Sequence, residues 1–453
     1  MAMGWAALHQ PLNDFFLAKF GSGTSTGILF RFDKYGSILS DADFVDPRQP
    51  DVGPQASVAV EKFSDLVNHV PRDSGDDMTV ALSADAVDST YFYRLLSPAI
   101  PLLPADGDQV VQDSILTSFS VAKAAALNVW ANIKAASSSG YMIEFKPSMA
   151  TPADWYDRTK GDSWTSAAFD ISAPTQSSAP ASEPGLWRLA PSEATLNRVL
   201  QGPLISGGYP STAFGEKKLA FATSKTVVPE AILQRALLPQ ETMTAVRIAP
   251  GLAISHSLVS DAISLQGATS DREVAADPVI AELDGASSAV FQRAITALPV
   301  SDRLALNQTI VESVETRPVT TDSIHLSFDY CLVTISRPWY VDGFVNQPNW
   351  YIPGEPKGQV SAGVPNGMAY LPIGLIAVRN LRITGAWDVD DQAAAALATD
   401  FGPFRVKGAG ASGGLVHDGL QTIGWILQQL PELPPQDPPV SSSTPPFSSS
   451  TPQ

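Results

Sequence analysis

The chain has 453 residues, of which 44% are hydrophobic, and its 46 acidic and 29 basic side chains give a net charge of −17. This length exceeds what one hydrophobic core usually supports, so we expect two or three domains or one large core with insertions. The negative charge opposes binding to nucleic acids and to anionic lipid surfaces, because both require clusters of Lys and Arg.

The single cysteine, Cys331, rules out an intramolecular disulfide and any cysteine-rich zinc or iron–sulfur site. It falls in a strand-like run, where we expect it to be a small buried hydrophobic residue. Residues 1–20 lack the early positive charge and unbroken apolar run of a secretory signal. No stretch reaches the roughly 18 apolar residues of a membrane helix. We therefore expect a soluble, cytoplasmic protein, with export by a route that needs no cleaved signal as the alternative.

The first half of the chain predicts a short helix at 12–20, a strand at 28–32 and a helix over 57–70. The clearest helix covers 114–134. One of its faces carries apolar residues at helical spacing: Ile115, Phe119, Ala122, Ala126, Val129 and Ile133. We expect a core helix rather than one lying on a membrane surface, because its polar face has only two lysines.

The strongest strand covers 323–335, where Ile324, Leu326 and Phe328 alternate with polar residues. This alternation predicts one buried and one wetter face, as in antiparallel sheets. A second β-rich run spans 371–383, a short helix is expected at 392–399, and a final apolar stretch covers 420–430.

We divide the chain into four regions. Residues 1–170 form a mixed α/β region, and 186–430 form a β-rich α+β region. Between them, 171–185 is rich in Ser, Ala and Pro and is expected to be a linker or an exposed loop. The Pro/Ser-rich tail, 431–453, is expected to be disordered. The predicted fold class is α+β, with a largely antiparallel central sheet and flanking helices.

Two segments, 23–27 and 410–414, match G-x-S-x-G, the pattern of a hydrolase nucleophile elbow. The first lies between a helix and a strand, the reverse of an elbow. The second, around Ser412, has no acid followed by a histidine downstream. Flexible turns explain both matches. The catalytic residues are therefore unknown, and Asp390, His325 and Ser412 are the weak candidates to test first.

An acidic cluster is formed by Asp388, Asp390 and Asp391. Three carboxylates suit a divalent cation, and one buried member could act as a general acid. The favoured interpretation is that they cap the helix expected at 392–399. The five histidines show no metal-binding spacing, and the Gly-rich segments lack a phosphate-binding pattern, so we expect no metal and no cofactor.

Segment 337–358 combines many aromatic rings with turn-forming residues. Its candidate binding residues are Arg337, Trp339, Tyr340, Phe344, Asn349, Trp350 and Tyr351. Such rings either fill a core from a loop or line a surface that binds another molecule. Aromatic faces beside amide and carboxylate groups suit a sugar ring or an extended peptide, and Trp, Tyr and Arg are the usual anchors of protein interfaces. The alternative is that Trp339 and Trp350 fasten the loop to the neighbouring sheet.

These observations favour a non-catalytic binding or assembly protein that presents this loop to a protein partner or to a neutral small ligand such as a saccharide. One alternative is a hydrolase or lyase whose active site comes from distant segments. Another is an effector or toxin exported without a signal peptide. On the binding hypothesis, Trp350→Ala weakens ligand capture at little cost in thermal stability, whereas a large fall in melting temperature marks a core side chain.

Overall fold

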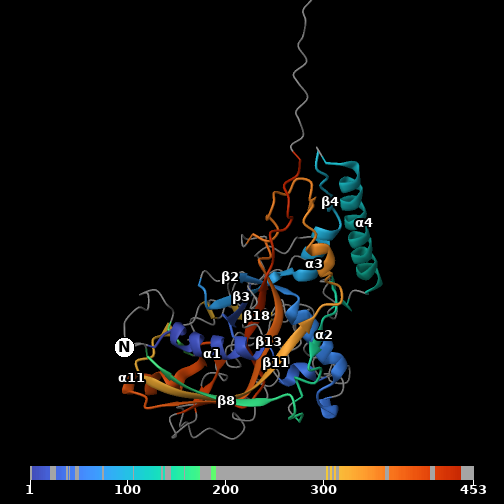
Figure 1. Ribbon diagram of the computed structural model, residues 1–453. Helices are drawn as coiled ribbons and strands as arrows, with labels where there is room; N and C mark the ends of the chain where they lie inside the picture. Colours follow the sequence, from blue (N-terminus) through green and yellow to red (C-terminus); the bar gives the residue numbers. More distant parts are fainter. Residues whose placement is uncertain are drawn as a thin grey trace, which may run out of the picture.

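The computed structural model describes residues 3–189 and 303–439 (Figure 1). Within these ranges, short gaps fall at 21–26, 37–38, 40, 46–49, 74–75, 106, 134–135, 138–143, 158, 174–184, 305–306, 309–310, 313–315, 363–366 and 409–413. Most of the predicted linker, Ser412 and residues 440–453 of the predicted tail lie outside the described residues. The fold is α+β, as predicted, with a large, mostly antiparallel sheet and flanking helices.

Three long strands form the middle of the ten-stranded sheet. β13 (Tyr370–Gly385) pairs antiparallel with β11 (Ser323–Ser336) on one side and with β18 (Gln421–Gln429) on the other. The predicted strands at 323–335 and 371–383 are thereby confirmed. The apolar stretch at 420–430 is the third of these strands.

The sheet extends in both directions from these strands. Beyond β18 it continues through β1 (Ile28–Asp33), then β3 (Thr79–Val87), which runs parallel to β1, and then β2 (His69–Asp73). The outer edge of β11 pairs with β7 (Met149–Thr151) and β8 (Thr165–Ser172). The far end of β13 pairs with β17 (Leu415–His417), which is followed by β16 (Lys407–Gly408). Strands from both sides of the predicted 171–185 boundary thus share one sheet, while the boundary itself stays a prediction.

The helix α1 (Trp5–Phe20) covers one face of the sheet and begins earlier than the predicted 12–20. Its buried residues, Trp5, Leu8, Leu12 and Phe16, recur every three or four positions, so they form one apolar stripe. This stripe packs against alternate residues of β11, including Leu326 and Phe328, in the largest hydrophobic cluster.

The opposite face of the sheet is covered by α2 (Ala56–Val67) together with Trp155. Burial along β11 changes sides between Tyr330 and Cys331, so Cys331, Val333 and Ile335 face this second cluster. Cys331 is buried, as predicted, and burial raises the pKa of its thiol to about 12. The thiol therefore stays protonated at neutral pH.

A third hydrophobic cluster lies at one end of the molecule, beside the helix α4 (Gln109–Asn132) (Figure 1). It also includes residues of α3 (Asp88–Leu96) and α10 (Asp342–Val345). The chain is held at this end by a two-stranded pairing of β12 (Trp350–Tyr351) with β4 (Ile100–Pro101).

The remaining elements are short. The helix α11 (Val389–Leu397) matches the helix predicted at 392–399 and begins three residues earlier. The smaller elements are η1 (Asp41–Phe44), η2 (Pro50–Val52), β5 (Ala136–Ser137), β6 (Glu144–Phe145), and the four strands of a second sheet, β10 (Thr316–Arg317), β9 (Trp187–Leu189), β14 (Ala398–Phe401) and β15 (Phe404–Arg405). None of the helices in the described part of the chain is long and apolar enough to cross a membrane.

Candidate functional site

The large rings of segment 337–358 lie inside the protein. Trp339, Phe344 and Trp350 each have a relative exposure of 0%. Phe344 stacks on Trp350 with ring centroids 5.2 Å apart, and Trp339 packs against Phe92 of α3 at 5.8 Å. Rings this deeply buried offer no face to a ligand, so the expectation that they line a binding surface does not hold in this structure. The alternative, that they fasten the loop to the rest of the fold, describes their position.

The other candidates of this segment are also part of the framework. Arg337 is buried, and its guanidinium forms an ion pair with Asp88 at 3.0 Å and donates hydrogen bonds to the carbonyls of Val67 and Pro372. Asn349 and Tyr351 are half-buried, and the carbonyl of Asn349 accepts a hydrogen bond from the amide of Leu102 at 2.9 Å.

Tyr340 is also half-buried, and it packs on Phe92 with ring centroids 5.3 Å apart. Desolvation raises the pKa of its hydroxyl. All seven candidates therefore lie within or beside the third hydrophobic cluster. Segment 337–358 therefore packs inside this end of the molecule and does not form its outer surface.

The helix α4 packs against this segment. Its inward face is the predicted one, since Phe119 and Ala126 are buried and Ile115, Ala122, Val129 and Ile133 are partly buried. Phe119 lies against Phe344 with ring centroids 6.2 Å apart. Two lysines hold the helix from the side: Lys123 donates to the carbonyls of Ser97 and Ala99 at 2.9 and 2.8 Å, and Lys146 donates to the carbonyl of Trp130 at 3.0 Å.

The predicted face therefore packs on the third hydrophobic cluster, while the rest of the helix surface is open to solvent. Of its 24 residues, only Phe119 and Ala126 are buried. The relative exposures of Val110 and Val121 reach 73% and 65%. Other exposed large apolar residues on the helix are Val111, Leu116 and Leu127. Several large apolar side chains exposed on one helix are a feature of contact surfaces.

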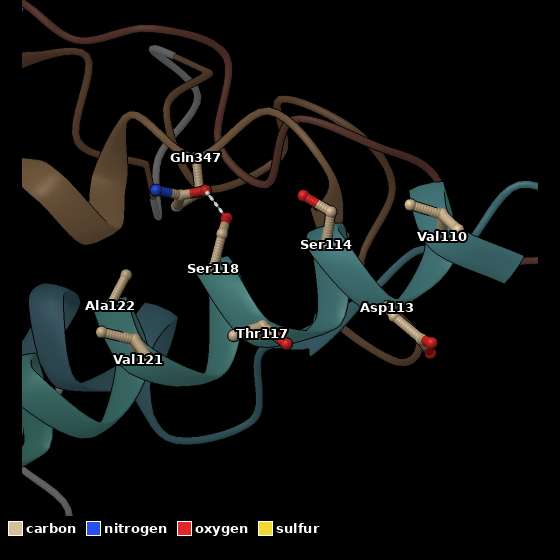
Figure 2. Close-up of a pocket in the computed structure, with 8 residues that line it drawn as sticks. All are labelled: Val110, Asp113, Ser114, Thr117, Ser118, Val121, Ala122 and Gln347. Carbon is tan, nitrogen blue, oxygen red and sulfur yellow. Dashed lines mark hydrogen bonds between the residues drawn. The ribbon is translucent and has the colours of Figure 1, made fainter.

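A shallow groove runs along α4, at the side nearest the loop that carries Gln347 (Figure 2). Its lining comprises Val110, Asp113, Ser114, Thr117, Ser118, Val121, Ala122 and Gln347. The hydroxyl of Ser118 donates to the side-chain oxygen of Gln347 at 3.3 Å, which fixes the loop beside the helix. Hydroxyl and methyl groups dominate the lining, and Asp113 carries its one formal charge.

The sequence contained a signal for this surface that the periodicity argument passed over. Between 109 and 132 the chain has two charged residues, Asp113 and Lys123. An ordinary surface helix carries charges on its outer face, whereas the outer positions here hold Val, Ala, Ser, Thr and Asn. The shortage of charge was therefore the informative feature, more than the arrangement of the inward residues.

The weak catalytic candidates are not assembled into a site. His325 lies on the open face of β11, where its Nδ1 is 2.8 Å from Oδ1 of Asp170 on β8. These side chains are 50% and 90% exposed, so water screens the pair. A shallow hollow beside them is lined by residues of β8, β11 and the end of β13, and Asp390 is not among these residues. Ser412 lies outside the described residues.

The acidic cluster has the capping role that the sequence favoured. Asp388 is the N-cap of α11 and accepts a hydrogen bond from the amide of Asp391 at 2.8 Å. The hydrogen bond from the hydroxyl of Thr320, followed by the one from the amide of Asp391, lowers the pKa of Asp388. Asp391 is buried, and its oxygens accept from Trp187 Nε1 at 2.7 Å and from the hydroxyl of Thr321 at 2.6 Å. Asp388 and Asp391 are thus occupied by protein donors, and no cluster of three metal-ligating side chains occurs among the described residues.

No protein-family model, curated protein or solved structure matches the chain. The surface chemistry of the described residues is therefore the basis for assigning a function.

Proposed function

We propose that this protein is a non-catalytic binding or assembly protein, and that the groove and exposed face of α4 contact a protein partner. The observation that carries the proposal is the exposure of Val110 and Val121 on a helix whose opposite side is fixed to an aromatic core. Burial of a valine side chain on association contributes roughly 1.5–3 kcal/mol, so a few such residues supply useful affinity.

A protein partner is favoured over a saccharide. Sugars are usually held by an exposed aromatic face with directional polar groups beside it. Trp339 and Trp350 offer no such face, because both side chains are fully buried. The α4 groove instead presents methyl and hydroxyl groups along a rigid rod, which suits the side chains of a second helix.

The test compares three forms of the intact chain: the unaltered sequence, Val121→Asp and Val389→Asp. Val389, on α11, is a matched control because it is 80% exposed and lies at the other end of the molecule (Figure 1). Affinity capture from the native source, with quantitative mass spectrometry, identifies proteins retained by the unaltered chain. A purified candidate is then titrated against each form by calorimetry.

We expect Val121→Asp to weaken binding of the candidate by at least tenfold, because a carboxylate replaces an apolar contact. The Val389→Asp variant keeps the affinity of the unaltered chain. Both substitutions lie at exposed positions, so the melting temperatures should agree within a few degrees. Equal binding of all three forms would rule out α4 as the contact surface.

A further inference from the structure

We infer that the partner of α4 is α4 of a second copy of this chain, packed antiparallel across a two-fold axis. This inference rests on the proposed function, since it names the occupant of the same surface. The outward side of the helix carries Val110, Ser114, Thr117, Ser118, Val121, Ala125 and Asn128, all of which are exposed. Apart from the adjacent pair Thr117 and Ser118, they recur every three or four positions and therefore form one continuous stripe.

The stripe is complementary to itself. An antiparallel pairing with its axis between Thr117 and Ser118 places Val121 of one copy opposite Ser114 of the other. The same register places Val110 opposite Ala125. Each large side chain thus meets a small one, which is the condition for close helix packing. A two-fold interface repeats every contact twice, so both grooves are filled by one arrangement.

The charges permit this pairing. Each chain has a net charge of −17, so two copies repel one another at long range. The contact surface contributes little to that repulsion, because Asp113 is the one charged residue lining the groove. In the proposed register the two Asp113 carboxylates lie on opposite sides of the two-fold axis.

The size of the surface sets the strength of the dimer. A helix of 24 residues is about 36 Å long, and a face about 10 Å wide offers roughly 400 Å² per copy. Stable interfaces bury about 800 Å² per partner, so this contact falls in the weak, reversible class. We therefore expect a dissociation constant of ~10–100 µM, measurable at concentrations that a purified protein reaches.

Sedimentation velocity of the intact chain across this concentration range is the first measurement. The unaltered chain should shift from monomer to dimer, and Val121→Asp should raise the dissociation constant at least tenfold. Ser114→Arg, which fills the opposing small position, should have the same effect. Circular dichroism of each variant checks that the fold is retained, and Val389→Asp should dimerise like the unaltered chain.

Cross-linking tests the register. Thr117→Cys places a thiol beside the two-fold axis, so oxidation should link two chains into a covalent dimer. Ser120→Cys, which is exposed on α4 but lies off the stripe, should not cross-link. The native Cys331 is buried and gives little background. A covalent dimer from Ser120→Cys but not from Thr117→Cys would overturn the register.

The two proposals fail in different ways. A chain that remains monomeric at every concentration overturns the second copy as the occupant. A protein whose capture still depends on Val121 would then support the proposed function with a different partner. A dimer that forms equally well in Val121→Asp and Ser114→Arg also overturns the inference, because its contacts lie elsewhere.

Discussion

Asp33 and Asp88 are buried so deeply that water no longer stabilises their charged forms. Burial raises the pKa of Asp33 to about 7, although its carboxylate accepts hydrogen bonds from the amide of Tyr35 at 3.1 Å and from Trp425 Nε1 at 3.4 Å. Burial also raises the pKa of Asp88, which the adjacent Arg337 guanidinium opposes. Both residues therefore couple the stability of the fold to pH.

The pKa of Asp33 gives a pH prediction. An unfolded Asp titrates near 4, so between about pH 4 and pH 7 the folded state binds the proton more tightly than the unfolded state. The stabilisation is complete below this window and is lost as pH rises through it. Between pH 5 and pH 8 we expect the free energy of unfolding of the unaltered protein to fall by about 1–3 kcal/mol more than that of Asp33→Asn, which lacks the titrating group. Urea denaturation at pH 5 and pH 8 measures this difference, and parallel profiles for the two proteins would contradict the assignment.

Trp350 gives the second prediction at this scale. Its side chain is fully buried and stacks on Phe344, so Trp350→Ala should lower the free energy of unfolding by ~3–5 kcal/mol. The Trp350→Phe variant keeps a ring in the same space and should cost clearly less. Thermal and chemical denaturation of both variants give the comparison. An unchanged melting temperature in Trp350→Ala would instead support the hypothesis that this side chain contacts a ligand.

At the level of elements, two aspartates at the start of α11 have different roles: Asp388 caps the helix, and Asp391 is a buried hydrogen-bond acceptor. Asp388→Ala removes the N-cap and should cost about 1 kcal/mol. Asp391→Ala leaves buried donors of Trp187 and Thr321 without an acceptor and should cost ~3 kcal/mol. Asp390 is exposed, and its replacement by Ala should change stability by less than about 0.5 kcal/mol. Equal stability of the three variants would contradict these roles of Asp388 and Asp391.

Periodicity predicted individual elements better than their positions in the molecule. The alternation over 323–335 and the helical spacing over 114–134 are local properties, and β11 and α4 follow them closely. The prediction lacked α3, although Phe92 of this helix packs against Trp339.

The burial of the aromatic rings in segment 337–358 could not be predicted from local sequence in the same way. Turn residues around Trp339 and Trp350 show that no regular helix holds them, but burial depends on contacts with α3 and α4, far away in the chain. The exposure of the α4 stripe depends equally on which elements of the described part of the chain pack against this helix, and that is not a local property of the sequence. The shortage of charged residues in α4 indicated an exposed contact surface, whereas the spacing of its apolar residues indicated only the face that packs on the core.

At the scale of the whole molecule, the net charge of −17 opposes self-association through long-range repulsion, while the α4 stripe is nearly uncharged. Salt screens the repulsion and leaves the apolar contact in place. Raising the ionic strength from about 0.05 M to about 0.5 M should therefore lower the dimer dissociation constant severalfold. Sedimentation at the two salt concentrations measures the effect, with Val121→Asp, whose dissociation constant should stay at least tenfold higher, as the control. Weaker association at high salt would show that ion pairs hold the dimer.

The pairing of β1 with β18 has a consequence for how the protein is made. Ile28 pairs with Gln428 and Phe32 pairs with Gly424. The early strand β1 therefore cannot complete its pairing until β18, one of the last segments of the sheet, has been synthesised. Until that segment leaves the ribosome, the backbone groups of β1 that bond to β18 lack their final partners, although Phe30 and Phe32 can already contact Trp5 and Phe16 of α1. Such distant closure slows folding and lengthens the time during which aggregation competes. We therefore expect the protein to aggregate more readily while it is being synthesised than after β18 has joined the sheet.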